Sequence, residues 1–68
     1  MRTEAIIGRR CQIQAGRTEF IGRFGTVVAH ESGMFRIKLL VPVNVPGAGE
    51  VKDVLWKHRD FRLLRLGR

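Results

Sequence analysis

The sequence has little of what marks secreted or membrane-spanning proteins. Its one cysteine, Cys11, cannot form an internal disulfide, which is typical of a reducing compartment. No apolar run approaches the roughly 20 residues that a membrane-spanning helix requires. The first ten residues, MRTEAIIGRR, lack the apolar region of a signal peptide. We therefore expect a soluble, cytoplasmic protein without a membrane partner.

Residue patterns for metal binding and catalysis are also missing. Cys11, His30 and His58 stand alone, without the C-x-x-C or H-x(3–5)-H spacing of a metal site. The pair Gly22 and Gly25 lacks the third glycine and the following helix of a dinucleotide site. No paired spacing gives a catalytic role to the acidic residues Glu31, Glu50, Asp53 and Asp60. We expect no metal, no cofactor and no catalysis; the alternative is an oligomeric enzyme with its site at a symmetry axis.

Acidic residues are scarce beside basic ones, and this imbalance is informative. Six Asp and Glu face thirteen Lys and Arg, most of them Arg, for a net charge of +7. Arginine keeps its charge at any physiological pH and presents a planar fork suited to phosphates and base edges. Such a balance favours a polyanionic partner, either a nucleic acid or an acidic protein. The alternative is that the charge only keeps a small domain soluble.

The chain length and hydrophobic pattern predict one small all-β domain. A chain of 68 residues buries only about 60% of its unfolded surface, so partners or self-association into a homo-oligomer would help it. Residues 34–40 alternate Phe35, Ile37 and Leu39 with Arg36 and Lys38, which gives a strand one apolar and one cationic face. The short polar break Glu31-Ser32-Gly33, in which Gly33 supplies the positive φ that a tight turn often needs, predicts a hairpin with residues 26–30. Further strands are expected at residues 9–15, 51–56 and 61–66, with a polar helical turn at 57–60. Residues 41–50, which hold both prolines, are expected to form a loop, with an extended edge at Val43–Val45 as an open alternative.

Part of the sequence resembles the KOW motif. The stretches RCQI at 10–13, GRFGTVV at 22–28 and FRIKL at 35–39, with Gly16 between the first two, follow the order of that motif. The motif occurs in SH3-like barrels of ribosomal proteins and transcription elongation factors. The resemblance covers roughly the first 40 residues, and the loop between Gly16 and Gly22 is about two residues longer than in the motif. It implies a single SH3-like barrel over residues 1–68, with about five antiparallel strands, a short 3-10 turn before the last one, and RNA slightly favoured over DNA.

The basic residues give the predicted nucleic-acid site. Spaced cations suit a phosphate backbone, and aromatic rings can stack on unpaired bases. Phe20, Phe24 and Trp56 are the candidates for stacking. Phe20, beside a polar loop, is the predicted stacking residue, whereas Phe24 is expected in the core or at its rim, and Trp56 in the core because a small barrel must bury its largest ring. The predicted phosphate ligands are Arg10, Arg17, Arg23, Arg36, Lys38, Lys57 and Arg59.

A second hypothesis makes the chain a protein-docking accessory subunit of a larger complex. Its arginine-rich surface would steer an acidic protein. Its loop at residues 41–49 is unusually apolar, with Val41, Val43 and Val45, and would form the apolar contact. Binding that survives nuclease treatment would favour docking over nucleic-acid binding.

Overall fold

The computed structural model describes residues 3–65. Five strands make one sheet, and the helical pieces are single turns. Their order along the chain is α1 (Thr3–Ile6), β1 (Arg10–Ile13), η1 (Thr18–Phe20), β2 (Phe24–Glu31), β3 (Met34–Val45), β4 (Gly49–Trp56), η2 (His58–Asp60) and β5 (Phe61–Leu63). The prediction of an all-β domain with about five strands and a 3-10 turn before the last strand is confirmed.

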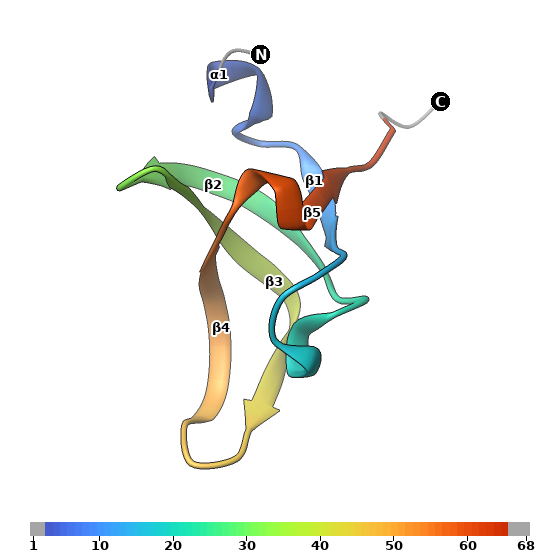
Figure 1. Cartoon of the computed structure of the whole chain (residues 1–68), viewed down its shortest axis with the longest axis vertical. Coiled ribbons are helices and arrows are strands. Elements are labelled where there is room, and N and C mark those ends of the chain that lie inside the picture. Colours follow the sequence, from blue (N-terminus) through green and yellow to red (C-terminus); the bar gives the residue numbers. More distant parts are fainter. Residues whose placement is uncertain (1–2, 66–68) are drawn as a thin grey trace.

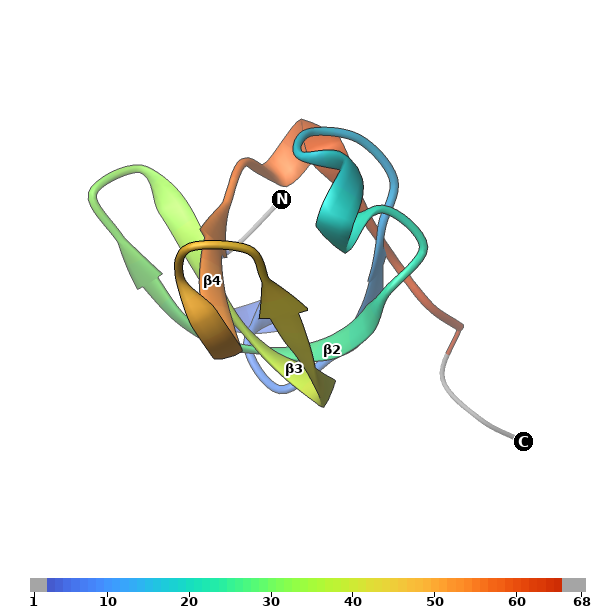
Figure 2. The same cartoon turned by 90° about the horizontal axis from the view of Figure 1, so that it is seen from below.

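All neighbouring strands are antiparallel, in the order β4-β3-β2-β1-β5 (Figure 1). The sheet curls around an interior when seen from below (Figure 2). Within residues 3–65, no ladder joins the two outer strands, β4 and β5. The sheet is therefore a half-open roll, and the ring of backbone hydrogen bonds does not close.

The predicted hairpin lies at the centre of the sheet, and its turn is one residue shorter than the predicted break. Glu31 belongs to β2 and pairs with Met34, which leaves two turn residues. Ser32 and Gly33 both have positive φ, of 52° and 77°. Two consecutive positive φ values define the type I′ turn, whose twist matches that of the flanking strands.

The interior of the roll takes the side chains that alternation assigns to it. Phe35, Ile37 and Leu39 of β3 are buried, and Lys38 between them is exposed. The period of two therefore places these side chains on opposite faces of the strand, as predicted. The other buried apolar residues are Ile6, Cys11, Ile13, Phe20, Val27, Val43, Val45, Trp56 and Phe61.

The prediction of a loop over residues 41–50 is wrong, because β3 continues to Val45. The extended stretch expected at Val43–Val45 is present, as a paired part of this strand. Val43 and Val45 pair with the start of β4 and are buried, so they do not form an apolar docking loop. The register of the β3–β4 ladder shifts between Lys38 and Val43. Pro42 lies inside that shift, where the strand has no partner in β4, so its missing N–H removes no hydrogen bond from this ladder.

Phe20 lies in the core, which corrects its prediction as a stacking residue. Its side chain is only 4% exposed and meets the ring of Trp56 edge to face, with centroids 5.5 Å apart. The indole Nε1 of Trp56 donates a hydrogen bond to the Ala15 carbonyl oxygen at 2.9 Å. Trp56 is thus buried as predicted, and it ties the loop before η1 to the interior.

The strand bounds differ from the predicted ones at their ends. β2 begins at Phe24, two residues earlier than predicted, and β5 ends at Leu63. The prediction had continued the last strand to residue 66, which lies outside the described residues. At the N-terminal end, Ile6 of α1 is buried in the core, whereas Ile7 beside it is exposed.

Candidate nucleic-acid interface

Two rows of side chains cross the outer face of the sheet. In the first row, Arg10 of β1 lies opposite Thr26 of β2, and Thr26 lies opposite Lys38 of β3. Neighbouring strands are about 4.8 Å apart, so the two cations stand roughly 10 Å from each other across the threonine. Both are exposed, because their chain neighbours turn into the core.

The second row lies beside the first on the same face. Arg62 of β5 pairs with Gln12 of β1, and Gln12 pairs with Phe24 of β2. Phe24 is 42% exposed, whereas Cys11 and Gly25 next to these pairs face inward. The two rows together define the outer sheet face: Arg10, Gln12, Phe24, Thr26, Lys38 and Arg62.

A shallow hollow opens at the Phe24 end of this face. It has a volume of about 250 Å³ and is lined by Gly22, Arg23, Phe24, Leu40 and Val41. Leu40 and Val41 are about 60% exposed, because they lie in the part of β3 where the ladder to β4 is interrupted. Gly22 has a φ of +86° and no side chain, so the rim stays open on that side. The hollow thus joins an exposed ring to Arg23, which has no carboxylate partner among residues 5–65.

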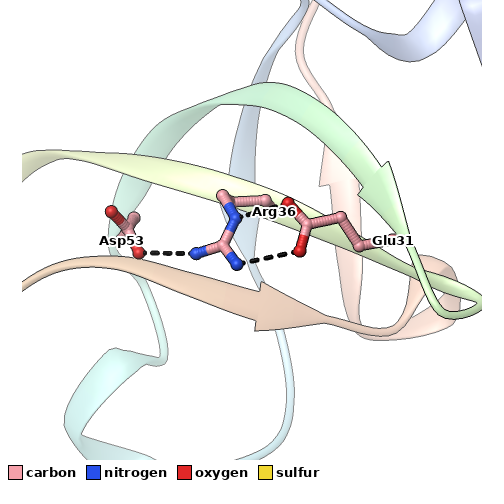
Figure 3. A network of polar contacts seen from close by, with 3 residues as sticks. All are labelled: Glu31, Arg36 and Asp53. Carbon is pink, nitrogen blue, oxygen red and sulfur yellow. Dashed lines mark hydrogen bonds and ion pairs between the residues drawn. The ribbon is translucent and has the colours of Figure 1, made fainter.

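Arg36 does not belong to the cationic surface, although it shares a strand face with Lys38. Its guanidinium donates to both carboxylate oxygens of Glu31, at 2.7 and 2.9 Å, and to Asp53 at 2.9 Å (Figure 3). The network joins β2, β3 and β4. Two carboxylates already occupy the donors that a phosphate would need. The prediction that Arg36 binds phosphate assumed an unpaired guanidinium, and that assumption is wrong. Arg36 links three strands of the sheet instead.

The Glu31–Arg36 contact predicts acid sensitivity. The hydrogen bond from Arg36 lowers the pKa of Glu31 below its ordinary value of 4.5. A carboxylate with a lowered folded pKa stabilises the fold above the unfolded pKa, and that contribution disappears as pH falls through the folded pKa. We expect the urea midpoint of the wild-type protein to decrease when the pH is lowered from neutral to values below 4.5. The same change of pH should lower the midpoint of Glu31→Gln by less. Equal pH dependence in both proteins would contradict this role.

The remaining predicted cations lie elsewhere. Lys57 and Arg59 line a second hollow of about 430 Å³, together with Gly33, Met34 and His58, where η2 meets the β2–β3 turn. We call this region the turn hollow. The turn hollow and the hollow beside Phe24 have no lining residue in common.

Arg17 lies with Lys57 on a smaller, mostly apolar hollow of about 170 Å³. Its guanidinium reaches Glu19 at 3.5 Å. The seven predicted phosphate ligands therefore do not form one site. Arg10, Arg23 and Lys38 gather around the outer sheet face, Lys57 and Arg59 gather at the turn hollow with Arg17 beside them, and Arg36 belongs to neither.

Four of the six residues of the outer sheet face were not in the predicted site: Gln12, Phe24, Thr26 and Arg62. Phe24 is the first residue of β2, and its exposure goes with the inward-facing Gly25 beside it. Arg62 alternates with the buried Phe61 and half-buried Leu63, so its outward direction is available from parity alone. Alternation does not predict the strand register, which places Arg62 and Phe24 on either side of Gln12.

Among the described residues, no group of three His, Cys, Asp or Glu is placed to hold a metal ion. None of the described helices has the length and apolar character to cross a membrane. Comparisons with protein-family models, curated proteins and solved structures found no match to this chain. The candidate interface therefore rests on the geometry of the chain itself.

Proposed function

We propose that this protein is a non-catalytic nucleic-acid-binding module, and that the outer sheet face is its binding surface. The observation that supports the proposal is the pairing state of its cations. Among residues 5–65, carboxylates lie within 4.0 Å of Arg17 and Arg36 only, so Arg10, Lys38 and Arg62 keep their charge available to a ligand. Asp53 lies opposite Lys38 in the ladder, yet its carboxylate bonds to Arg36.

The chemistry of this surface suits phosphates. Cations on neighbouring strands can neutralise successive phosphates without demanding one fixed geometry, and Gln12 and Thr26 between them add polar groups. The 3-10 turn η2 directly before β5 supports the resemblance to SH3-like barrels of the KOW type. That resemblance favours RNA over DNA as the ligand.

The test is the salt dependence of binding. Each phosphate contact contributes about 0.7 to 0.9 to the slope of log affinity against log salt concentration. We expect Arg10→Gln/Lys38→Gln to reduce that slope by about 1.4 to 1.8 and to weaken binding to every nucleic acid tested. Fluorescence polarisation with labelled single-stranded RNA, duplex RNA and duplex DNA at several salt concentrations measures both quantities.

Lys57→Gln/Arg59→Gln is the matched control, because it removes the same two charges from the turn hollow. We expect this control to lower affinity only through the general loss of charge, with little change in slope. A larger effect from the control than from Arg10→Gln/Lys38→Gln would move the site to the turn hollow. No salt-dependent binding by the wild-type protein would reject the function.

One observation favours the second candidate, docking to an acidic protein. Leu40 and Val41 leave apolar surface exposed beside Arg23, and such surface often marks a protein contact. This docking surface differs from the one predicted from the sequence, because Val43 and Val45 are buried. A partner that stays bound in a pull-down after nuclease treatment would favour it.

A further inference from the structure

Phe24 is an unusual member of the outer sheet face. Of the five aromatic residues, Phe20, Phe35, Phe61 and Trp56 are buried, and Phe24 alone is exposed. Phe24 is the first residue of β2, and its neighbours in the sequence are Arg23 and the inward-facing Gly25. One large ring therefore stands in solvent among cations, although the core of this small domain would gain from burying it.

The space beside the ring is suited to a flat, partly apolar group. The hollow of about 250 Å³ has Phe24, Leu40 and Val41 as apolar lining. It also contains Arg23, whose planar guanidinium can stack on a ring or bond to a phosphate. Gly22 lines the same hollow without a side chain and has open space around it, so the hollow stays accessible on that side.

We propose that this hollow takes an unpaired nucleobase, stacked on Phe24, and that the ligand is therefore a single strand. The proposal rests on the function proposed above and names the class of nucleic acid. Bases of a single strand expose their faces to aromatic side chains, whereas bases of a duplex are stacked on each other. The cations of the first row, Arg10 and Lys38, then hold the phosphates next to that base.

Charge decides between a base and the apolar side chain of a protein as occupant. An acidic protein would place its apolar side chain in the hollow and its carboxylates near the cations, but exposed ion pairs each contribute little to binding. Each neutralised phosphate of a nucleic acid also releases condensed counterions, which strengthens its binding. A nucleotide brings a ring and a phosphate together, and this surface offers both a ring and free cations within two rows of the sheet. The observations thus favour the nucleotide.

The experiment compares Phe24→Leu with Phe24→Tyr. Leucine keeps apolar surface and loses the aromatic face, whereas tyrosine keeps both. The probes are a labelled oligouridylate of about ten nucleotides, within the usual site size for such folds, and an RNA duplex of equal length. We expect Phe24→Leu to weaken binding of the single strand by roughly 5- to 150-fold and to leave duplex binding unchanged. Phe24→Tyr should bind the single strand like the wild type.

Val28→Ala is the control, because Val28 is equally exposed on the same strand and lies outside the hollow. Equal losses for Phe24→Leu and Val28→Ala, or equal losses for single strand and duplex, would overturn the stacking proposal. Binding that depends on Arg10 and Lys38 but not on Phe24 would leave the proposed function intact. A Phe24→Leu protein that loses a nuclease-resistant protein partner, with oligouridylate binding unchanged, would assign the hollow to docking.

Discussion

Gly16→Ala should destabilise the fold more than alanine at any other glycine of the described chain. Gly16 has a φ of +112°, and an added Cβ would lie 2.6 Å from Cζ2 of Trp56. The indole cannot move aside easily, because Phe20 packs against it and its Nε1 is bonded to Ala15. A left-handed backbone costs about 1–2 kcal/mol and overpacking about 1–3 kcal/mol. The sum is comparable with the roughly 3–10 kcal/mol expected for a chain of this size.

Cys11 provides the measurement. Its side chain is fully buried, and burial raises its pKa to about 11. Because the thiolate is the reactive form, a thiol reagent at pH 8 modifies Cys11 only when the sheet opens. We expect Gly16→Ala to speed this labelling by one to several orders of magnitude and to lower the urea midpoint. Labelling at the wild-type rate would mean that the loop and the indole rearrange without cost.

Two other glycines separate the two causes. Gly33 has positive φ and open space around it, so Gly33→Ala should show the backbone cost alone. Gly25 has no positive φ, but an added Cβ would meet Ile37 and the Lys38 carbonyl oxygen, both at 2.6 Å, so Gly25→Ala should show the steric cost alone. Gly16→Ala should exceed both. A larger effect at Gly33 than at Gly16 would reject this explanation.

The strand pattern was predictable where local rules decide it. The alternation from Phe35 to Leu39 fixes which side chains enter the core. Gly33 marks the turn of the hairpin, because glycine adopts positive φ without cost, whereas the positive φ of Ser32 was not predictable from its residue type. A close neighbour at Gly25 was also predictable, because a glycine near the start of a strand usually marks a turn or a place where another part of the backbone comes close.

What local rules cannot give is which strands and side chains meet. Two prolines argue for a loop after residue 40, and only the interrupted β3–β4 ladder shows how Pro42 fits in a strand. Arg36 reads as a free cation until the register brings Glu31 and Asp53 to it from two other strands. Both wrong predictions, the loop after residue 40 and the unpaired Arg36, thus depend on contacts between strands, which a local sequence pattern does not contain.

The two phenylalanines show the same limit most directly. Phe20 and Phe24 are four residues apart, in a segment where neither period two nor period 3.6 holds, and the sequence analysis chose the wrong one as exposed. The 3-10 turn η1 directs Phe20 onto Trp56, and the β1–β2 register places Phe24 outside. Their roles are therefore opposite, and alanine substitutions should separate them.

Phe20→Ala should lose most of the stability of the fold. Truncating a buried phenylalanine costs about 3–5 kcal/mol, which is a large part of what a chain of this size has. Trp56 is the only tryptophan, so its fluorescence during urea unfolding reports the loss directly. Where Phe20→Ala is unfolded without denaturant, Phe20→Leu should show a smaller fall in midpoint.

Phe24→Ala is the matched substitution, with the same atoms removed from a ring that is 42% exposed. Its urea midpoint should fall much less than that of Phe20→Ala, because truncating a ring that is already 42% exposed loses much less buried apolar area. Its affinity for single-stranded RNA should fall, while folded Phe20→Leu should bind like the wild type. Equal destabilisation by Phe20→Ala and Phe24→Ala would mean that Phe24 belongs to the core. In that case the outer sheet face would lose its aromatic member, and the ligand would be held by phosphate contacts alone.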